Sequence, residues 1–139
     1  MSFVLDSSVA LSWCFTDERT VESQDVLKLA RTRAIFVPSL WHVEMCNILG
    51  RAYRNGRLDE TDLGITLKMF AALELHTDSA VLHVSSSVLF LLMQTYLLTA
   101  YDAVYLELAL RLNLPLATLD SDLAEASKRA GVPLVVQLQ

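Results

Sequence analysis

The chain has few of the features that identify several common classes of protein. Its two cysteines, Cys14 and Cys46, lie in helical patterns without metal-ligand spacing. We therefore expect two reduced core thiols, with one structural disulfide as the alternative. A net charge of −5 argues against non-specific nucleic-acid binding through a broad basic face. Asp6 interrupts any hydrophobic segment of a signal peptide, so we expect a protein of the reducing cytoplasm.

Charge is also lacking along one stretch, which raises the question of a membrane span. No Asp, Glu, Lys or Arg occurs from 80 to 101, which is long enough to cross a bilayer. However, His83, Ser87 and Gln94 form a polar stripe at helical spacing. We therefore expect a largely buried helix of a soluble protein, without membrane contact.

Short apolar strands alternate with helical patterns over the 139 residues, and this length suits one domain over 1–139. The expected strands are 2–5, 34–37, 73–76, 114–118 and 132–136. The expected helices are 8–14, 18–31, 39–54, 59–73, 78–97, 101–112 and 121–130. This order predicts an α/β fold with a parallel sheet of five (or four) strands and helices on both faces. A hydrophobic content of 53% exceeds the needs of a soluble monomer and favours a subunit or partner interface.

Four carboxylates lie in apolar segments, where an uncompensated charge is costly: Asp6, Glu44, Asp102 and Asp120. Asp6 and Asp120 follow predicted strands, and ligands bind beyond the carboxyl ends of parallel strands. The alternative for both is a capping role, because Asp is a favoured residue at helix N-termini. The simplest shared partner for several anions is a divalent cation.

Glu44 and Asp102 fit ordinary structural roles less well. Glu44 lies in the middle of a helix with no Lys or Arg one turn away, so its alternatives are a wet groove or a long-range salt bridge. Asp102 can join Thr99 in a capping box. However, Glu107 and Arg111 are spaced as an ion pair and predict the solvated face of that helix. On the helical wheel this places Asp102 on the buried side.

Carboxylate oxygens in this number suit Mg²⁺ or Mn²⁺ better than zinc, which prefers nitrogen and sulfur. The three histidines, His42, His76 and His83, show no ligand spacing, and we interpret all three as structural or surface residues. The sequence thus favours a metal-dependent enzyme.

The segments that contain the four acids resemble PIN-domain ribonucleases, specifically the VapC-type toxins of toxin–antitoxin pairs. The matching segments are 4–9, 37–44 with Asn47, 99–106 and 116–123, of which Tyr101-Asp102-Ala103-Val104-Tyr105-Leu106 carries the most specific match. The resemblance implies an α/β/α sandwich whose acids hold Mg²⁺ or Mn²⁺. It also implies cleavage of single-stranded RNA segments, a homodimer, and inhibition by a cognate antitoxin.

By position, the resemblance also assigns roles to residues. The metal-binding and catalytic acids would be Asp6, Glu44, Asp102 and Asp120, using a metal-activated water to hydrolyse a phosphodiester. Ser8 and Thr118 match hydroxyl positions that orient carboxylates or metal-bound water, and Asp122 could join them. RNA or antitoxin contacts would come from Arg51, Arg54 and Arg57, for which a solvated helix end is the alternative.

Two other functions of α/β proteins need residues that this sequence lacks. A phosphatase of the haloacid dehalogenase type needs a second Asp where Ser8 stands. A response-regulator receiver needs a strand-terminal Lys, whereas the lysines lie in helical patterns. The remaining alternative is a catalytically inactive PIN-like protein-binding module.

Overall fold

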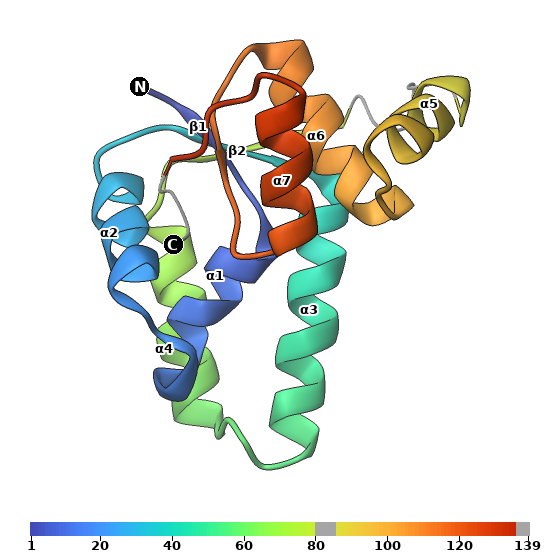
Figure 1. Ribbon diagram of the computed structural model, residues 1–139. Helices are drawn as coiled ribbons and strands as arrows, with labels where there is room; N and C mark the ends of the chain where they lie inside the picture. The colour runs from blue at the N-terminus through green and yellow to red at the C-terminus, as the bar shows by residue number, and fades with distance from the viewer. Residues whose placement is uncertain (80–85, 136–139) are drawn as a thin grey trace.

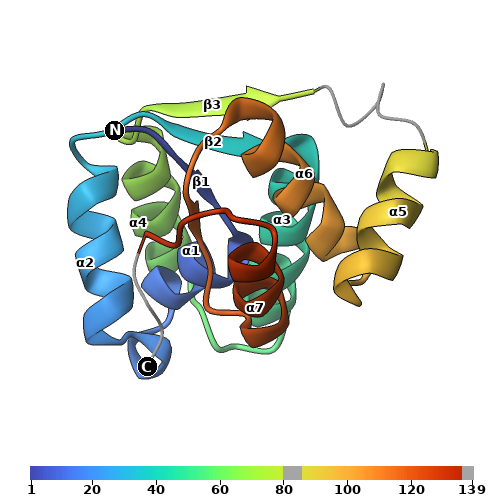
Figure 2. The same cartoon turned by 45° about the horizontal axis from the view of Figure 1, so that its top comes forward.

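A computed structural model describes residues 1–79 and 86–135. Within them the strands form one parallel sheet in the order β3-β2-β1-β4, seen from two sides in Figures 1 and 2. The strands are β1 (Phe3–Leu5), β2 (Ile35–Pro38), β3 (Leu75–Asp78) and β4 (Leu116–Ala117). A fifth strand was the other option for 132–136, and there the described residues form only an isolated bridge between Leu116 and Leu134.

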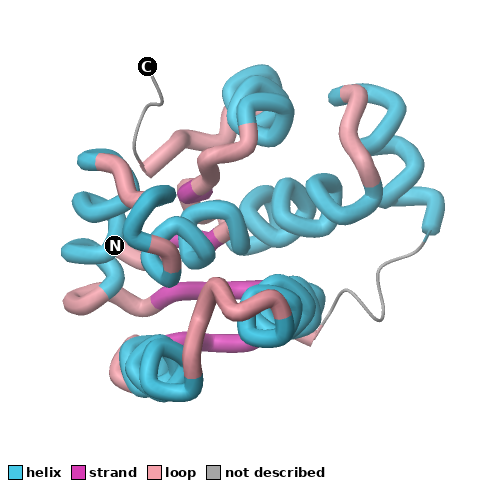
Figure 3. Tube along the Cα trace, turned by 90° about the horizontal axis from the view of Figure 1, so that it is seen from below, coloured by secondary structure: helices cyan, strands magenta, loops and turns pink. Residues whose placement is uncertain are grey.

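Helices lie on both sides of this sheet, as Figure 3 shows, so the predicted α/β class is confirmed. Helix α6 packs against β1, β2 and β4, while α3 contacts β2 and α1. The helical elements are α1 (Ser7–Cys14), η1 (Thr16–Glu18), α2 (Val21–Ala30), α3 (Ser39–Arg54), α4 (Glu60–Ala71), α5 (Ser86–Tyr96), α6 (Ala100–Leu112) and α7 (Ser121–Arg129).

Strand β1 lies in the core, between β2 and β4 of the sheet. Phe3, Val4 and Leu5 are all buried, as expected for a parallel strand covered on both faces. Beyond β1 the chain adds β2 and β3 on one side, and β4 then returns to the other side. The order of the strands therefore switches between β1 and β4, and such a switch point is the usual ligand site of open α/β sheets.

Strand β3 and the residues at its end differ from the prediction. The predicted strand 73–76 lies at 75–78, so Asp78 ends a strand and does not open a helix. Arg111 of α6 donates to Asp78 at 2.9 Å and to Glu107 at 2.7 Å. Glu107 is buried, and the prediction that it faces solvent was wrong. A buried carboxylate of this kind needs the paired guanidinium.

Helix α5 differs most from expectation. We expected a largely buried helix over this region, but none of the residues of α5, all within the described part of the chain, is buried. Phe90 and Leu91 are 58% and 63% exposed, and Leu97 beyond the helix is 82% exposed. The helix packs on α6 at the edge of the molecule (Figures 1 and 2). His83 of the predicted polar stripe lies outside the described residues.

Length and apolar content decide whether a helix could cross a membrane. Over 1–79 and 86–135 no single helix has both the length and the apolar content to cross a bilayer. Only α5 and α6 taken together pass, and they are bent by 101° at the break between them.

The two cysteines, both in the described residues, are free thiols. Cys14 is half-buried, and burial raises the pKa of its thiol to about 12. Cys46 is exposed, so the prediction of two core thiols was wrong for this residue. It occupies the outer face of α3, whose inner face carries the buried Trp41, Met45 and Leu49.

Candidate active site

The four acids of the sequence argument line one cavity of about 560 Å³ at the carboxyl edge of the sheet. Asp6 follows β1, Glu44 lies in α3, Asp102 is in the first turn of α6, and Asp120 precedes α7. The fold thus brings together side chains from four distant parts of the sequence. The other lining residues are Ser7, Ser8, Leu11, Leu40, Val43, Asn47, Ile48 and Tyr101.

Asp6 is the most buried of the four acids and is held by two hydroxyls. Its Oδ2 accepts hydrogen bonds from Ser8 Oγ at 2.6 Å and from Thr118 Oγ1 at 2.7 Å. The backbone N–H groups of Leu119 and Asp120 donate to these same two hydroxyls, at 2.9 and 3.0 Å. A hydroxyl that accepts from an amide directs its single proton elsewhere, here to Asp6.

The capping interpretation of Asp6 is wrong, because its side chain makes no cap hydrogen bond to α1 within the described structure. Burial raises the pKa of Asp6, the hydrogen bonds from Ser8 and Thr118 lower it, and the charge of Asp120 raises it. Both hydroxyls donate to Oδ2, a backbone hydrogen bond from Ser7 also lowers the pKa of Asp6, and Asp6 lines the cavity.

Replacing Thr118 with Val tests this arrangement. The variant keeps the shape of the side chain but removes one donor from Asp6, so the pKa of Asp6 should rise further. We expect Mn²⁺ to bind roughly 10-fold more weakly in calorimetric titrations, the lower end of the range for groups that orient metal ligands, because Ser8 still donates to Asp6. Thr66→Val is the matched control, since Thr66 is also buried but lies in α4. Equal weakening in both variants would contradict a specific role for Thr118.

Glu44 has a partner that the sequence argument did not identify. Tyr105 of α6 donates from its hydroxyl to Glu44 Oε1 at 2.6 Å, across 61 positions of the chain. Burial raises the pKa of Glu44, the Tyr105 hydrogen bond lowers it, and the charge of Asp6 raises it again. Among the described residues a neutral hydroxyl thus takes the place of the long-range salt bridge, whereas the alternative of a groove agrees with the cavity that Glu44 lines.

Asp102 shows most clearly that the four acids share an electrostatic environment. Burial and then the charges of Asp120, Asp6 and Glu44 raise its pKa to about 6. Its backbone N–H donates to Thr99 Oγ1 at 3.2 Å, so Thr99 caps α6. The capping does not require the Asp102 carboxylate, which lines the cavity.

Asp120 has two roles at once. Its Oδ1 accepts from the backbone N–H of Leu123 at 2.9 Å and caps α7, as the capping interpretation predicted. It also lines the cavity beside Asp6 and contributes to the raised pKa of both Asp6 and Asp102. Capping α7 and lining the cavity are therefore compatible for this residue.

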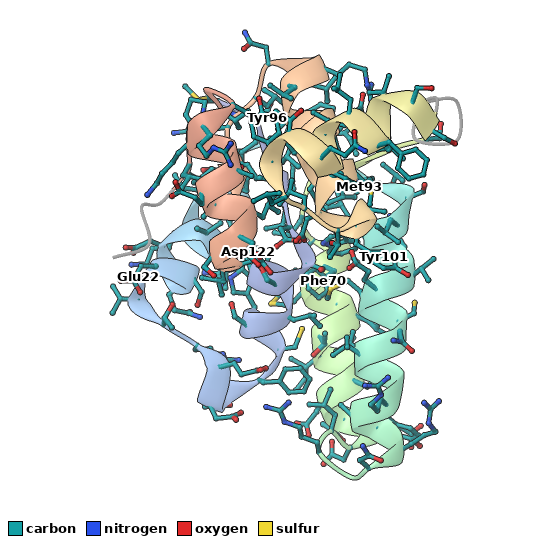
Figure 4. The ribbon with its side chains drawn as sticks, turned by 45° about the vertical axis from the view of Figure 1, so that its right-hand side comes forward. Glu22, Phe70, Met93, Tyr96, Tyr101 and Asp122 are labelled. Atoms are coloured by element: carbon teal, nitrogen blue, oxygen red, sulfur yellow. The ribbon has the colours of Figure 1, made fainter. Side chains whose placement is uncertain are left out.

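The remaining predicted residues lie outside the cavity. Asp122, labelled on α7 in Figure 4, is exposed, and its charge also raises the pKa of Asp102. Arg51 and Arg54 are exposed in the last turns of α3. Arg57 donates to both carboxylate oxygens of Asp17 at 3.0 Å and lies 3.8 Å from the centre of the Phe15 ring. These contacts of Arg57 connect η1 with the loop after α3.

The donor set suits a hard divalent cation. Among the described residues, the cavity lining contains four carboxylates and no His or Cys, and Mg²⁺ and Mn²⁺ favour such oxygen donors. As arranged, no three acidic, His or Cys side chains in the described residues are close enough to hold one ion.

Sequence reasoning missed part of the lining. Ser7 and Tyr101 line the cavity, and Tyr101 is 63% exposed at the start of α6, where Figure 4 labels it. Both residues directly follow or precede a candidate acid, which was the only signal for them in the sequence. The apolar side of the cavity is formed by Leu11, Leu40, Val43 and Ile48.

Comparisons with known proteins agree with this fold. The family model of the PIN domain matches residues 3–129. The crystal structure of PAE2754 from Pyrobaculum aerophilum superposes with a TM-score of 0.67 at 22% identity, covering 97% of this chain and 84% of that chain. VapBC2 from Rickettsia felis, solved bound to a DNA fragment from its promoter, gives a TM-score of 0.64 at 17% identity, covering 96% and 97%. No curated protein matches the sequence.

Proposed function

The chain belongs to the PIN domain family, and from that premise we propose that it is a divalent-metal-dependent endoribonuclease, the toxin of a toxin–antitoxin pair. The observation that carries the proposal is the cavity at the switch point of the sheet, which Asp6, Glu44, Asp102 and Asp120 line together. The charge of Asp120 raises the proton affinity of Asp6 and Asp102, and the charge of Asp6 raises that of Glu44 and Asp102. A cation bound between these carboxylates would offset the repulsion between their charges.

The four acids would hold Mg²⁺ or Mn²⁺, and neighbouring hydroxyl groups orient two of them. When bound, the ion would lower the pKa of a coordinated water and neutralise charge on the phosphate. Ser8 and Thr118 orient Asp6, and Tyr105 orients Glu44. An oxygen of one of these carboxylates that does not contact the ion would accept the proton of the attacking water.

RNA is the proposed substrate, in single-stranded segments. No Lys or Arg lines the cavity within the described part of the chain, so phosphate binding inside it depends on the cation. Tyr101 and the apolar side of the cavity suit contact with unpaired bases, which stack on exposed aromatic rings. The exposed Arg51 and Arg54 remain candidates for phosphate or antitoxin contacts beyond the cavity.

The proposal includes protein partners, namely a cognate antitoxin and a second copy of the chain, in the cytoplasm. It is supported by the exposed apolar side chains on and beside α5: Val88, Phe90, Leu91 and Leu97. Apolar groups gathered in this way favour a protein interface. The Rickettsia felis neighbour was solved as a VapBC2 assembly, and we extend an antitoxin partner from it to this chain.

The experiment is an RNA cleavage assay with purified protein free of any antitoxin. We expect cleavage of a single-stranded RNA when Mg²⁺ or Mn²⁺ is added, and none when EDTA is present, because the acids alone repel phosphate. A double-stranded RNA of the same sequence serves as the control and should be cut more slowly. Metal-saturated protein that cuts no RNA would instead support the inactive PIN-like binding module.

A further inference from the structure

Tyr105 is buried so deeply that its hydroxyl requires an explanation. The residue is 1% exposed, and it is among the largest fully buried side chains of the protein. A phenylalanine would fill the same space without bringing a polar group into the core. A buried hydroxyl is tolerated when it has a partner, and its partner here is Glu44 of the cavity, at 2.6 Å.

This hydrogen bond joins two helices at the acidic cavity. Tyr105 lies one turn after Asp102 in α6, and Glu44 lies in the middle of α3. Burial and the charges of Asp6 and Glu44 raise the pKa of Tyr105, so its hydroxyl keeps its proton and acts as the donor. Tyr105 contacts Oε1, the Ser7 hydroxyl also hydrogen-bonds to the Glu44 carboxylate and lowers its pKa, and Glu44 lines the cavity.

A glutamate at this position needs such a restraint more than the three aspartates do. Its side chain has one more rotatable bond, so fixing a free Glu side chain loses more rotamer freedom than fixing an Asp. Asp6 is held by two hydroxyls, and Asp120 by the backbone N–H of Leu123. The Tyr105 hydroxyl gives Glu44 a comparable restraint before any ligand enters.

We propose that Tyr105 is a positioning residue, which fixes the Glu44 carboxylate in the orientation that presents it to a cation in the cavity. The proposal rests on the function proposed above, and it deepens that function. Tyr105 itself does not line the cavity among the described residues, so it acts through Glu44. Its role therefore differs from that of Tyr101, which is exposed at the cavity.

The test is the Tyr105→Phe variant, measured by Mn²⁺ calorimetry and by RNA cleavage. Loss of a hydrogen bond to a charged group should weaken Mn²⁺ binding and lower kcat roughly 10- to 100-fold. KM for RNA should stay within about threefold, because the ring and the cavity surface are retained. Tyr53→Phe, which removes the hydroxyl of a half-exposed tyrosine elsewhere on α3, should match the wild type.

A double-mutant cycle separates positioning from a general effect on the fold. In a Glu44→Gln background the Tyr105→Phe change should weaken Mn²⁺ binding no further, because the group it acts through is already altered. Additive losses, or an unchanged Mn²⁺ affinity in Tyr105→Phe, would overturn the proposal. If Mn²⁺ affinity depends on Tyr105 and Glu44 in this way but the protein cuts no RNA, the proposed function is refuted and the positioning role of Tyr105 still holds. Wild-type protein that binds no Mn²⁺ would overturn both.

Discussion

Replacing Asp6 with Asn is expected to reduce metal-dependent RNA cleavage roughly 1,000-fold or more, the scale of effect for removing a central electrostatic group of an active site. Asp6 is 4% exposed and lies at the switch point of the sheet, held by Ser8 and Thr118. Asn keeps the shape of the side chain but loses the charge that binds a cation. The measurement is the single-turnover cleavage rate at saturating Mn²⁺.

Asp122→Asn is the matched control for this prediction. Asp122 is also an acid near the site, but it is exposed and outside the cavity lining of the described residues, so its replacement should change the rate less than about threefold. The stability of the metal-free protein gives a second readout. Asp6→Asn removes one of several repelling charges, so its melting temperature without metal should equal or exceed that of the wild type. An inactive variant that is also unfolded would not support the account.

Lowering the pH from 7 to 5 is expected to weaken Mn²⁺ binding and cleavage by about tenfold, with the midpoint of the decline near pH 6. The group responsible is Asp102, whose pKa is raised to about 6 by burial and by the charges of Asp120, Asp6 and Glu44. Protons and the cation compete for this carboxylate. The measurement is the Mn²⁺ dissociation constant and the cleavage rate at subsaturating metal across this range.

The stability of the metal-free fold should have the opposite pH dependence. A carboxyl whose pKa is higher in the folded chain than in the unfolded chain stabilises the fold while it is protonated. For Asp102 this stabilisation is fully present below pH 3.8 and is lost as the pH rises through about 6. Asp122→Asn should shift the midpoint of metal binding to lower pH, because the Asp122 charge helps raise the Asp102 pKa. Affinity that is constant between pH 5 and 7 would contradict this assignment.

The sequence was sufficient to predict the sheet and the four acids because both follow from local patterns. Buried parallel strands are short apolar runs, and β1 and β4 each precede one of the candidate acids. A carboxylate placed in such surroundings is conspicuous whatever the fold. The meeting of Asp6 and Asp120 at one edge then follows from the parallel order of the strands, which sequence alternation predicts, whereas Glu44 and Asp102 reach the cavity from helices α3 and α6.

Contacts between distant residues could not be predicted in this way. Tyr105 and Glu44 are 61 positions apart, and only the packing of α6 beside α3 brings them together. Arg111 was expected to bind Glu107 on a solvated face, but it also binds Asp78 at the end of β3, and Glu107 is buried. Helix α5 was expected to be buried from its apolar composition, yet burial depends on whether another element, or another chain, covers it.

Anomalous X-ray diffraction from crystals soaked in Mn²⁺ tests the central claim most directly, namely that Asp6, Glu44, Asp102 and Asp120 form one divalent-cation site. We predict an anomalous peak inside the cavity, with carboxylate oxygens of these acids as ligands, and no such peak in crystals of Asp6→Asn. A manganese peak elsewhere, or a cavity without manganese at saturating concentrations, would contradict the account.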